Sequence, residues 1–136
     1  MNNDFNQQVI QEFRSNAGKV GGGFEGRPVL LLTTTGAKSG REHTTPLMSL
    51  AEGDALYVFA SMAGAPASPA WYHNLLAHPR VAVEVGTERF EAQAAAVDRA
   101  ERDRLYAKQA ALYSNFAEYE AKTARVIPVV RLTRTT

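Results

Sequence analysis

The sequence predicts an α+β fold: a small barrel of about six mainly antiparallel strands with helices at its periphery. Runs rich in Val, Leu, Thr and aromatic residues alternate with Gly, Pro or charged turns. Short Gly-containing turns at 52–54 and 86–88 are typical of antiparallel hairpins. A barrel is favoured because closure removes the exposed edges of an open sheet. A chain of 136 residues can bury one core without disulfides, so we expect a single domain over 1–136.

The first expected element is a helix from Asp4, which can cap it, to about Ser15. Its apolar residues share one face: Phe5, Val9, Ile10 and Phe13. Glycines at 18 and 21–23 end the helix. Residues 1–22 are therefore expected to form an N-terminal helix and linker within the single domain.

The strands are expected at 28–35, 43–51, 55–61, 81–85, 89–97 and 125–133. Between the third and the fourth, Pro69 opens a short helix to about Ala77, and Pro79 prevents it from continuing.

A second helix is expected after the fifth strand. Asp98 and Glu101 have the spacing of a capping box there. We expect this helix to carry Leu105, Leu112 and Phe116 along one side, with a break at Asn115.

Composition excludes several function classes. The net charge of +1 argues against a general nucleic-acid binder. The absence of cysteine removes thiol catalysis, disulfides and thiolate metal sites, so redox chemistry requires a bound cofactor. The three histidines, His43, His73 and His78, do not have the spacing of metal ligands, and no serine motif indicates a catalytic triad. We therefore expect no metal site and no hydrolytic chemistry.

No apolar run approaches the roughly 20 residues that span a bilayer, and the N-terminus lacks a signal-peptide pattern. We expect a cytoplasmic protein, monomeric or homodimeric, that acts on a small molecule. Its short N-terminal helix carries little positive charge, which allows at most weak peripheral association with a membrane.

A loop with anion-binding character follows the first strand. Gly36 and Gly40 enclose Lys38 and Ser39, and Arg41 comes next. Charge-assisted hydrogen bonds from Lys and Arg are about twice as strong as neutral ones, so the loop suits phosphate or carboxylate. An ordinary solvated surface turn explains these residues equally well, and the P-loop pattern is absent.

A second candidate stretch, Ser61–Leu75, follows the third strand. Its Pro69-Ala70-Trp71 segment places free amides and a partial positive charge at a helix N-terminus, where an anion can bind. Trp71 is explained equally well as a core anchor. Ser61 is explained equally well as a cap of the following turn.

A series of motifs occurs in a specific order from about Gly22 to the end of the chain. They are GRPVLLLTTTG at 26–36, KSG at 38–40, TPL at 45–47, AS at 60–61, GAP at 64–66, PAWYHNL at 69–75 and TARVIPVV at 123–130. In order and spacing they resemble the deazaflavin-dependent nitroreductase family. The resemblance implies a split β-barrel that binds reduced coenzyme F420, a deazaflavin, and passes a hydride to a quinone, a nitroaromatic or a similar acceptor.

The coenzyme has a flat tricyclic ring, a ribityl chain, a phosphate and an oligoglutamate tail. The resemblance implies phosphate and tail contacts for Ala37, Lys38 and Ser39, beside Arg41 of the same loop. It implies contacts along the ring and ribityl chain for His43, Thr44, Thr45, Pro46, Leu47 and Met48. It places Ala60, Ser61 and Met62 near the reactive edge, and Ala70, Trp71, Tyr72, His73 and Asn74 at the helix start that closes the phosphate side.

Tyr113, Phe116 and Tyr119 match positions where the family places aromatic residues over the substrate pocket. Steps of three along a helix keep them adjacent, although a plain core stripe has the same spacing. The catalytic candidates are Tyr113 or Tyr119, for orienting the acceptor or donating a proton, and Ser61, for polarising the coenzyme edge.

The sequence departs from the family pattern at several positions. Ala37, Met62 and Ser68 stand where basic or polar residues are common, which indicates a looser grip on the anionic tail. Met48 and Phe116 replace positions that are Tyr in nitro-reducing members, which weakens the expectation of nitro reduction. Two other functions stay open: an FMN-dependent split-barrel oxidoreductase, and a non-catalytic carrier of a deazaflavin or an apolar molecule.

Overall fold

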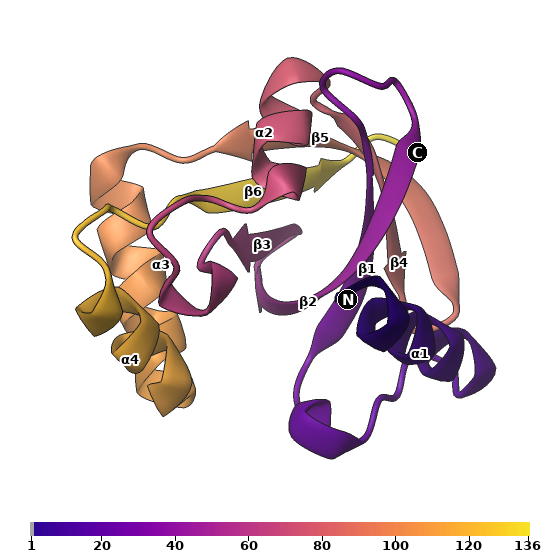
Figure 1. Ribbon diagram of the computed structural model, residues 1–136, viewed down its shortest axis with the longest axis horizontal. Helices are drawn as coiled ribbons and strands as arrows, with labels where there is room; N and C mark the ends of the chain where they lie inside the picture. The colour runs from indigo at the N-terminus through magenta and orange to yellow at the C-terminus, as the bar shows by residue number, and fades with distance from the viewer. Residues whose placement is uncertain (1) are drawn as a thin grey trace.

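The computed structural model describes residues 2–136 and shows six strands closed into a barrel (Figure 1). The strands are β1 (Val29–Thr35), β2 (Glu42–Glu52), β3 (Ala55–Phe59), β4 (Arg80–Val85), β5 (Glu88–Ala96) and β6 (Val129–Arg134). Around the barrel they follow the order β1-β2-β3-β6-β5-β4, and every adjacent pair is antiparallel. The expected fold class is confirmed.

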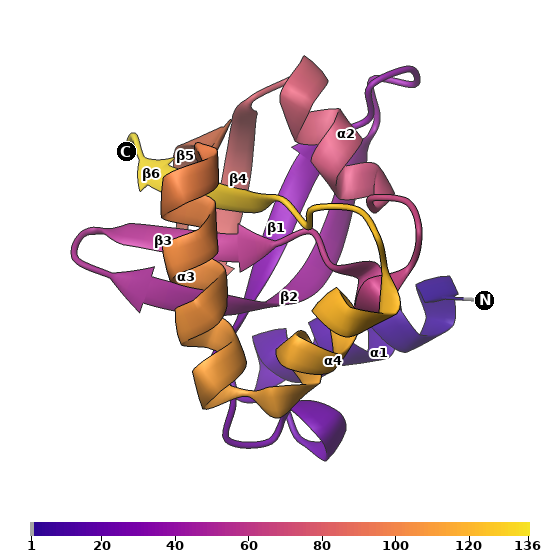
Figure 2. The same cartoon turned by 90° about the vertical axis from the view of Figure 1, so that its left-hand side faces the viewer.

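Helices surround the barrel. They are α1 (Asn2–Ser15), α2 (Ala70–Ala77), α3 (Arg99–Leu112) and α4 (Ser114–Lys122), with short 3-10 turns η1 (Gly22–Phe24) and η2 (Met62–Gly64). Helices α3 and α4 cover one side of the barrel, and α1 lies on another side, beside β1 and β2 (Figures 1 and 2). Within residues 2–136, no helix has the length and apolar character needed to cross a membrane.

Strand β1 explains why an unbroken apolar run appears in the sequence. Leu30 and Leu32 point into the barrel core, while Val29 and Leu31 point outward under α1. Both faces of the strand are therefore covered, and no polar alternation is needed. On β5, by contrast, Phe90 and the alanines at 92 and 94 alternate with exposed residues, the pattern of a strand with one face in water.

Helix α1 is fixed to the barrel by packing and by one ion pair. Its apolar residues Val9, Ile10 and Phe13 pack in the cluster that contains Leu31. Arg14 donates to Glu84 of β4 through Nε at 3.0 Å and Nη2 at 2.8 Å. Just beyond the helix, a Cβ on Gly18 would lie 2.6 Å from Cα of Gly86 in the β4–β5 turn. Any side chain at this position would therefore collide with the turn. Gly18 also has a φ of +91°, which residues other than glycine rarely adopt.

The remaining helices close the mouth and one outer face of the barrel. Trp71 and Leu75 of α2 insert into the barrel core. The predicted cap of α3 is present: the Asp98 carboxylate accepts from the Glu101 amide at 2.9 Å. Leu105 of α3 and Phe116 of α4 belong to a second apolar cluster over the outer face of β2, β3 and β6.

Four of the expected boundaries were wrong. Helix α1 begins at Asn2, so Asp4 lies in its first turn and does not cap it. Strand β3 ends at Phe59 rather than at 61, because η2 begins at Met62 with positive φ angles. Strand β6 begins at Val129 rather than at 125. The helical break falls at Tyr113, whose φ of −137° and ψ of 103° are extended, rather than at Asn115. Leu112, the last residue of α3, is 58% exposed and does not share a buried face with Leu105.

Candidate active site

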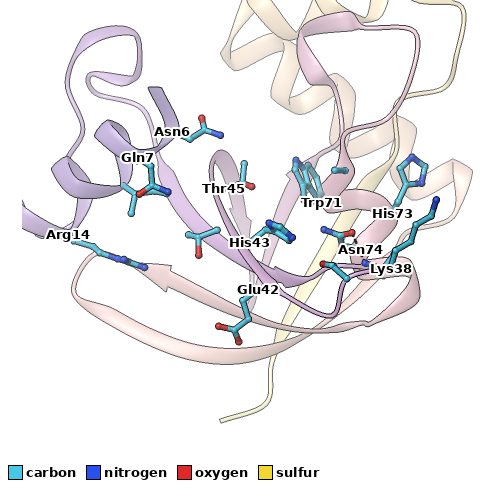
Figure 3. A pocket seen from close by; sticks show the side chains of 16 residues that line it. Asn6, Gln7, Arg14, Lys38, Glu42, His43, Thr45, Trp71, His73 and Asn74 are labelled. Carbon is cyan, nitrogen blue, oxygen red and sulfur yellow. Dashed lines mark hydrogen bonds between the residues drawn. The ribbon is translucent and has the colours of Figure 1, made fainter. Parts of the chain in front are cut away.

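A cavity of about 860 Å³ lies between α1, the first half of β2, the loop after β1 and the start of α2 (Figure 3). In Figure 3, His43 and Thr45 of β2 lie between Asn6 and Gln7 of α1 on one side and Trp71 of α2 on the other. The lining residues are Asn6, Gln7, Ile10, Arg14, Gly36, Ala37, Lys38, Ser39, Glu42, His43, Thr44, Thr45, Ala70, Trp71, His73 and Asn74. Several of the predicted coenzyme-binding residues therefore meet at one cavity.

Within residues 2–136, one edge of β2 is unpaired over 42–48, and the first part of this stretch, 42–45, lines the cavity. Residues 42–48 pair with β1, whereas pairing with β3 begins only at Ser49. The amide of Ser49 donates to the carbonyl of Pro28, on the β1 side. Since the sides alternate along a strand, the backbone groups of Thr44, Pro46 and Met48 face away from β1, toward the unpaired edge.

Pro46 fits this arrangement. It lies opposite Leu31 at a position where β1 and β2 exchange no backbone hydrogen bond, so its missing N–H removes nothing from the ladder. The neighbouring pair of the same kind, Thr33 and Thr44, has its hydroxyl oxygens 2.8 Å apart. The unpaired edge thus offers the carbonyl of Pro46 and complete peptide groups at Thr44 and Met48.

The loop at 36–41 is held in a defined shape. The amide of Gly36 donates to the carbonyl of Arg41 at 2.7 Å, and the amide of Gly40 donates to the carbonyl of Gly36 at 3.0 Å. Asn74 of α2 accepts from the amide of Ala37 at 3.0 Å and donates to the Thr34 hydroxyl at 3.2 Å. Asn74 therefore fastens the loop to α2.

The two long cations of the lining differ in their partners. The Arg14 guanidinium is paired with Glu84, and this hydrogen bond raises the pKa of Arg14. Lys38 is exposed, and no carboxylate of residues 2–136 lies within salt-bridge distance of it. Lys38 is thus the lining cation that a bound anion can engage without breaking an ion pair.

The start of α2 forms the other wall near Lys38. Ala70 and Trp71 line the cavity, and the first amides of a helix have no intrahelical acceptor. Trp71 is 6% exposed and also belongs to the barrel core. Trp71 therefore anchors the helix in the core and also lines the cavity.

Other predicted residues lie outside the lining. Leu47 packs against the barrel core, and Met48 packs against the second cluster. Ala60 and Ser61 are buried at the end of β3, while Met62 is 50% exposed. The remaining ones are Pro46, which is buried, Tyr72, which packs edge-on against Trp71 and His73, and Arg41, which is exposed.

The aromatic set lies at the α3–α4 junction. Phe116 is 5% exposed and packs edge-on against Phe59, with ring centroids 5.5 Å apart. Tyr113 and Tyr119 are half-buried at the margin of this cluster. The Tyr119 hydroxyl accepts from Asn115 Nδ2 at 3.1 Å. Phe116 is therefore a core residue, whereas Tyr113 and Tyr119 both reach the surface.

The sequence profile of one family, described as F420H(2)-dependent quinone reductase, matches residues 6–134. The chain belongs to this F420H(2)-dependent quinone reductase family. A Mycobacterium tuberculosis protein named F420H(2)-dependent quinone reductase is 41% identical over 126 residues, which cover 90% of this chain and 85% of that protein. The resemblance to a deazaflavin-dependent family is thereby confirmed.

The solved structures that are similar to this chain include the following two. One, titled F420-H2 dependent reductase (FDR-A), is 38% identical, has a TM-score of 0.71, and the match covers 78% of this chain and 94% of that one. The other, described as a domain-swapped dimer, is 33% identical, has a TM-score of 0.73, and the match covers 93% of this chain and 94% of that one.

For this member of the F420H(2)-dependent quinone reductase family, sequence reasoning missed the contribution of α1 to the lining. Gln7, Ile10 and Arg14 are three and four residues apart, the spacing of one helix face, so the periodicity contained the signal. Gly36 and Glu42 were missed as well. Among residues 2–136, no group of three or more His, Asp or Glu side chains could hold a metal ion.

Proposed function

We propose that this protein reduces quinones with reduced coenzyme F420, and that the coenzyme occupies the cavity between α1, β2, the 36–41 loop and α2. The unpaired edge of β2, which runs beside a cavity with Lys38 at its rim, is the observation that carries this proposal. The volume of about 860 Å³ lies within the range of about 300–1,000 Å³ typical of ligand pockets.

The 36–41 loop and the start of α2 suit the phosphate and the acidic tail. Lys38 supplies a cation, and Ser39 a hydroxyl, from the same loop. The first amides of α2, at Ala70 and Trp71, add the partial positive charge of a helix N-terminus. Because Lys38 is the one lysine of residues 2–136 that lines this part of the cavity, the loop and the start of α2 attract the acidic tail moderately rather than strongly.

The edge of β2 suits the ribityl chain and the flat ring. Peptide groups at Thr44 and Met48 can donate and accept there without competing with another strand. The aromatic wall of Trp71 gives one apolar surface for a planar ligand. Asn6 and Gln7 of α1 line the side of the cavity opposite Trp71 (Figure 3).

When bound, the coenzyme supplies a hydride, and reduction of a quinone to a hydroquinone consumes one hydride and one proton. The protein's own task is to orient both partners and to deliver the proton. The Tyr119 hydroxyl accepts from Asn115, which leaves its own proton available for donation. We assign proton delivery to Tyr119, with Tyr113 as the neighbouring candidate, and polarisation of the coenzyme edge to Ser61.

Nitroaromatic compounds remain a second class of acceptor for the same site. The Phe116 ring is buried between α4 and the barrel and offers no hydroxyl to an acceptor. We therefore expect quinones to be reduced faster than nitroaromatics.

A paired titration tests the proposal. Binding of F420 and of FMN is measured by ligand fluorescence on the same protein, followed by steady-state turnover with a quinone and a nitroaromatic. We expect tighter binding of F420 than of FMN, because FMN lacks the acidic tail, and quinone-dependent oxidation of the reduced coenzyme.

Three other outcomes of this titration would support a different function or contradict the proposed site. A yellow protein that binds FMN more tightly supports the FMN-dependent alternative. F420 binding without reduction of any acceptor supports a carrier. Failure to bind either ligand contradicts the proposed site itself.

A further inference from the structure

The connection between β3 and α2 contains a strained turn. Met62, Ala63 and Gly64 are three successive residues with φ angles of 46°, 54° and 82°. Two of them carry side chains, and residues other than glycine rarely adopt this left-handed region. Such strain persists only where the surrounding structure fixes it, and it is typical of ligand-binding segments.

The guanidinium of Arg125 fixes this turn from the side of β6. Its Nε donates to the carbonyl of Ala65 at 2.8 Å, and its Nη1 donates to the Ser68 hydroxyl at 3.2 Å. Its Nη2 donates to the carbonyls of Ala60 at 3.1 Å and Ser61 at 2.9 Å. Figure 2 shows the segment after α4 running beside the β3–α2 connection. One side chain thus holds both ends of the turn.

Arg125 carries out this task without an acidic partner. All four acceptors are neutral, and no carboxylate of residues 2–136 pairs with it. Burial lowers the pKa of Arg125. The planar fork of a guanidinium can reach several acceptors at fixed angles, which the single ammonium of lysine cannot do.

The turn is also wedged against α4. A Cβ added to Gly64 would lie 2.9 Å from the carbonyl oxygen of Tyr119 and 3.0 Å from Cβ of Lys122. The turn that contains Ser61 and Met62 therefore touches the helix that carries Tyr119. A shift of the turn would therefore displace Ser61 and Tyr119, to which the proposed function assigns polarisation of the coenzyme edge and proton delivery.

The shape of the turn suits a hydrogen-bond acceptor. Ser61 is right-handed, with φ −77° and ψ −37°, and Met62 is left-handed. This succession directs consecutive backbone N–H groups toward one side and forms a concavity for a partial negative charge. Oxygen atoms on the edge of a flat heterocycle fit that description.

We propose that Arg125 is a positioning residue for the coenzyme ring: it holds the turn at Ser61–Gly64 in the strained shape that binds the ring edge. The proposal rests on the proposed function, since it assumes a deazaflavin in the cavity. It differs from the role of Lys38, which acts on the phosphate and the tail. The two residues are therefore separable by removing part of the ligand.

The test measures binding of two probes to folded protein: full-length F420, and its deazaflavin riboside, which lacks the phosphate and the tail. Arg125→Gln is expected to raise the Kd of both probes by about the same factor, roughly tenfold or more, because the turn must then be ordered at the moment of binding. Arg125→Lys should fall in between. Lys38→Ala should weaken binding of the full coenzyme alone.

Arg102→Gln is the matched control. Arg102 donates to the carbonyl of Ile127 at 2.8 Å, so it stabilises the same segment as Arg125 without touching the turn. It should lower the Tm and leave both Kd values within about twofold of the parent. If Arg125→Gln does not fold, the same two Kd values are measured on Arg125→Lys, and both should be higher than those of the parent protein.

Two results overturn the proposal. A folded Arg125 variant with an unchanged riboside Kd, while the parent protein binds, overturns the role of Arg125 alone. Absence of binding of either probe to the parent overturns the proposed function, and the role of Arg125 with it.

Discussion

At the scale of single residues, electrostatics separates Lys38 from the other cation of the cavity. Arg14 is paired with Glu84, whereas Lys38 has no ion pair in the described part of the chain. Lys38→Ala should raise the Kd for F420 about tenfold, the lower end of what a charge-assisted hydrogen bond contributes, because Lys38 is exposed and screened by solvent. Fluorescence titration measures the change.

Lys19→Ala is the control for this prediction, because Lys19 is exposed and lies outside the cavity lining. The effect of Lys38→Ala should also shrink at high salt. Equal Kd values for Lys38→Ala and Lys19→Ala would show that the 36–41 loop does not bind the acidic tail.

Tyr119 is the second residue whose role can be isolated. Tyr119→Phe removes the hydroxyl that accepts from Asn115 and should lower kcat about 100-fold, the lower range for a general acid, with an unchanged Kd for F420. Tyr113→Phe should have a smaller effect on kcat. Tyr57→Phe, a buried tyrosine in the cluster under α3, serves as the control. Weaker coenzyme binding with unchanged kcat would place Tyr119 outside the acceptor site.

At the scale of elements, Asn74 connects α2 with the 36–41 loop. Asn74→Ala removes its hydrogen bonds to the Ala37 amide and the Thr34 hydroxyl. We expect faster amide exchange in the loop and weaker F420 binding, because the loop then orders only on binding. Asn74→Asp keeps the acceptor but loses the donor, and should have a smaller effect. Unchanged exchange in Asn74→Ala would show that the loop holds its shape alone.

We expect the attachment of α3 to the β2–β3 hairpin to depend on pH. Hydrogen bonds from Arg104 and then Lys108 lower the pKa of Glu52 from 4.5 to about 2. Because the folded-state pKa is depressed, this stabilisation is fully present above pH 4.5 and is lost as the pH falls toward 2. Thermal unfolding of Glu52→Gln against the parent should show a Tm difference at neutral pH that disappears near pH 2.

Glu118→Gln is the control for this measurement, because Glu118 is exposed on α4 and forms no ion pair within residues 2–136. A Tm difference between Glu52→Gln and the parent that stays constant from neutral to acidic pH would contradict the contribution of the Arg104 and Lys108 contacts.

At the scale of the whole molecule, local signals were enough for most of the barrel. The hairpin turns, the apolar run of β1 and the Asp98 cap depend on neighbouring residues, and the structure contains all three. The break at Tyr113 was misplaced because its cause is tertiary: the Tyr106 hydroxyl donates to the carbonyl of Phe116 at 2.6 Å and ties α4 back onto α3.

The cavity was only partly predictable for the same reason. Its loop and the start of α2 have recognisable motifs, whereas its α1 wall depends on contacts distant in sequence. Those contacts are the Arg14–Glu84 pair and the approach of Gly18 to Gly86. Likewise, nothing adjacent to Arg125 in the sequence indicates that it holds a turn some 60 residues earlier.

We propose that the cavity beside the unpaired edge of β2 binds reduced F420, whose hydride passes to a quinone. The most direct test mixes the protein with reduced F420 under anaerobic conditions, adds a water-soluble naphthoquinone, and records the absorbance of oxidised coenzyme. We expect oxidation that requires both protein and quinone, forms one hydroquinone per coenzyme, and is slowed by Lys38→Ala at limiting coenzyme. Coenzyme that is bound but not oxidised when quinone is added would contradict the account.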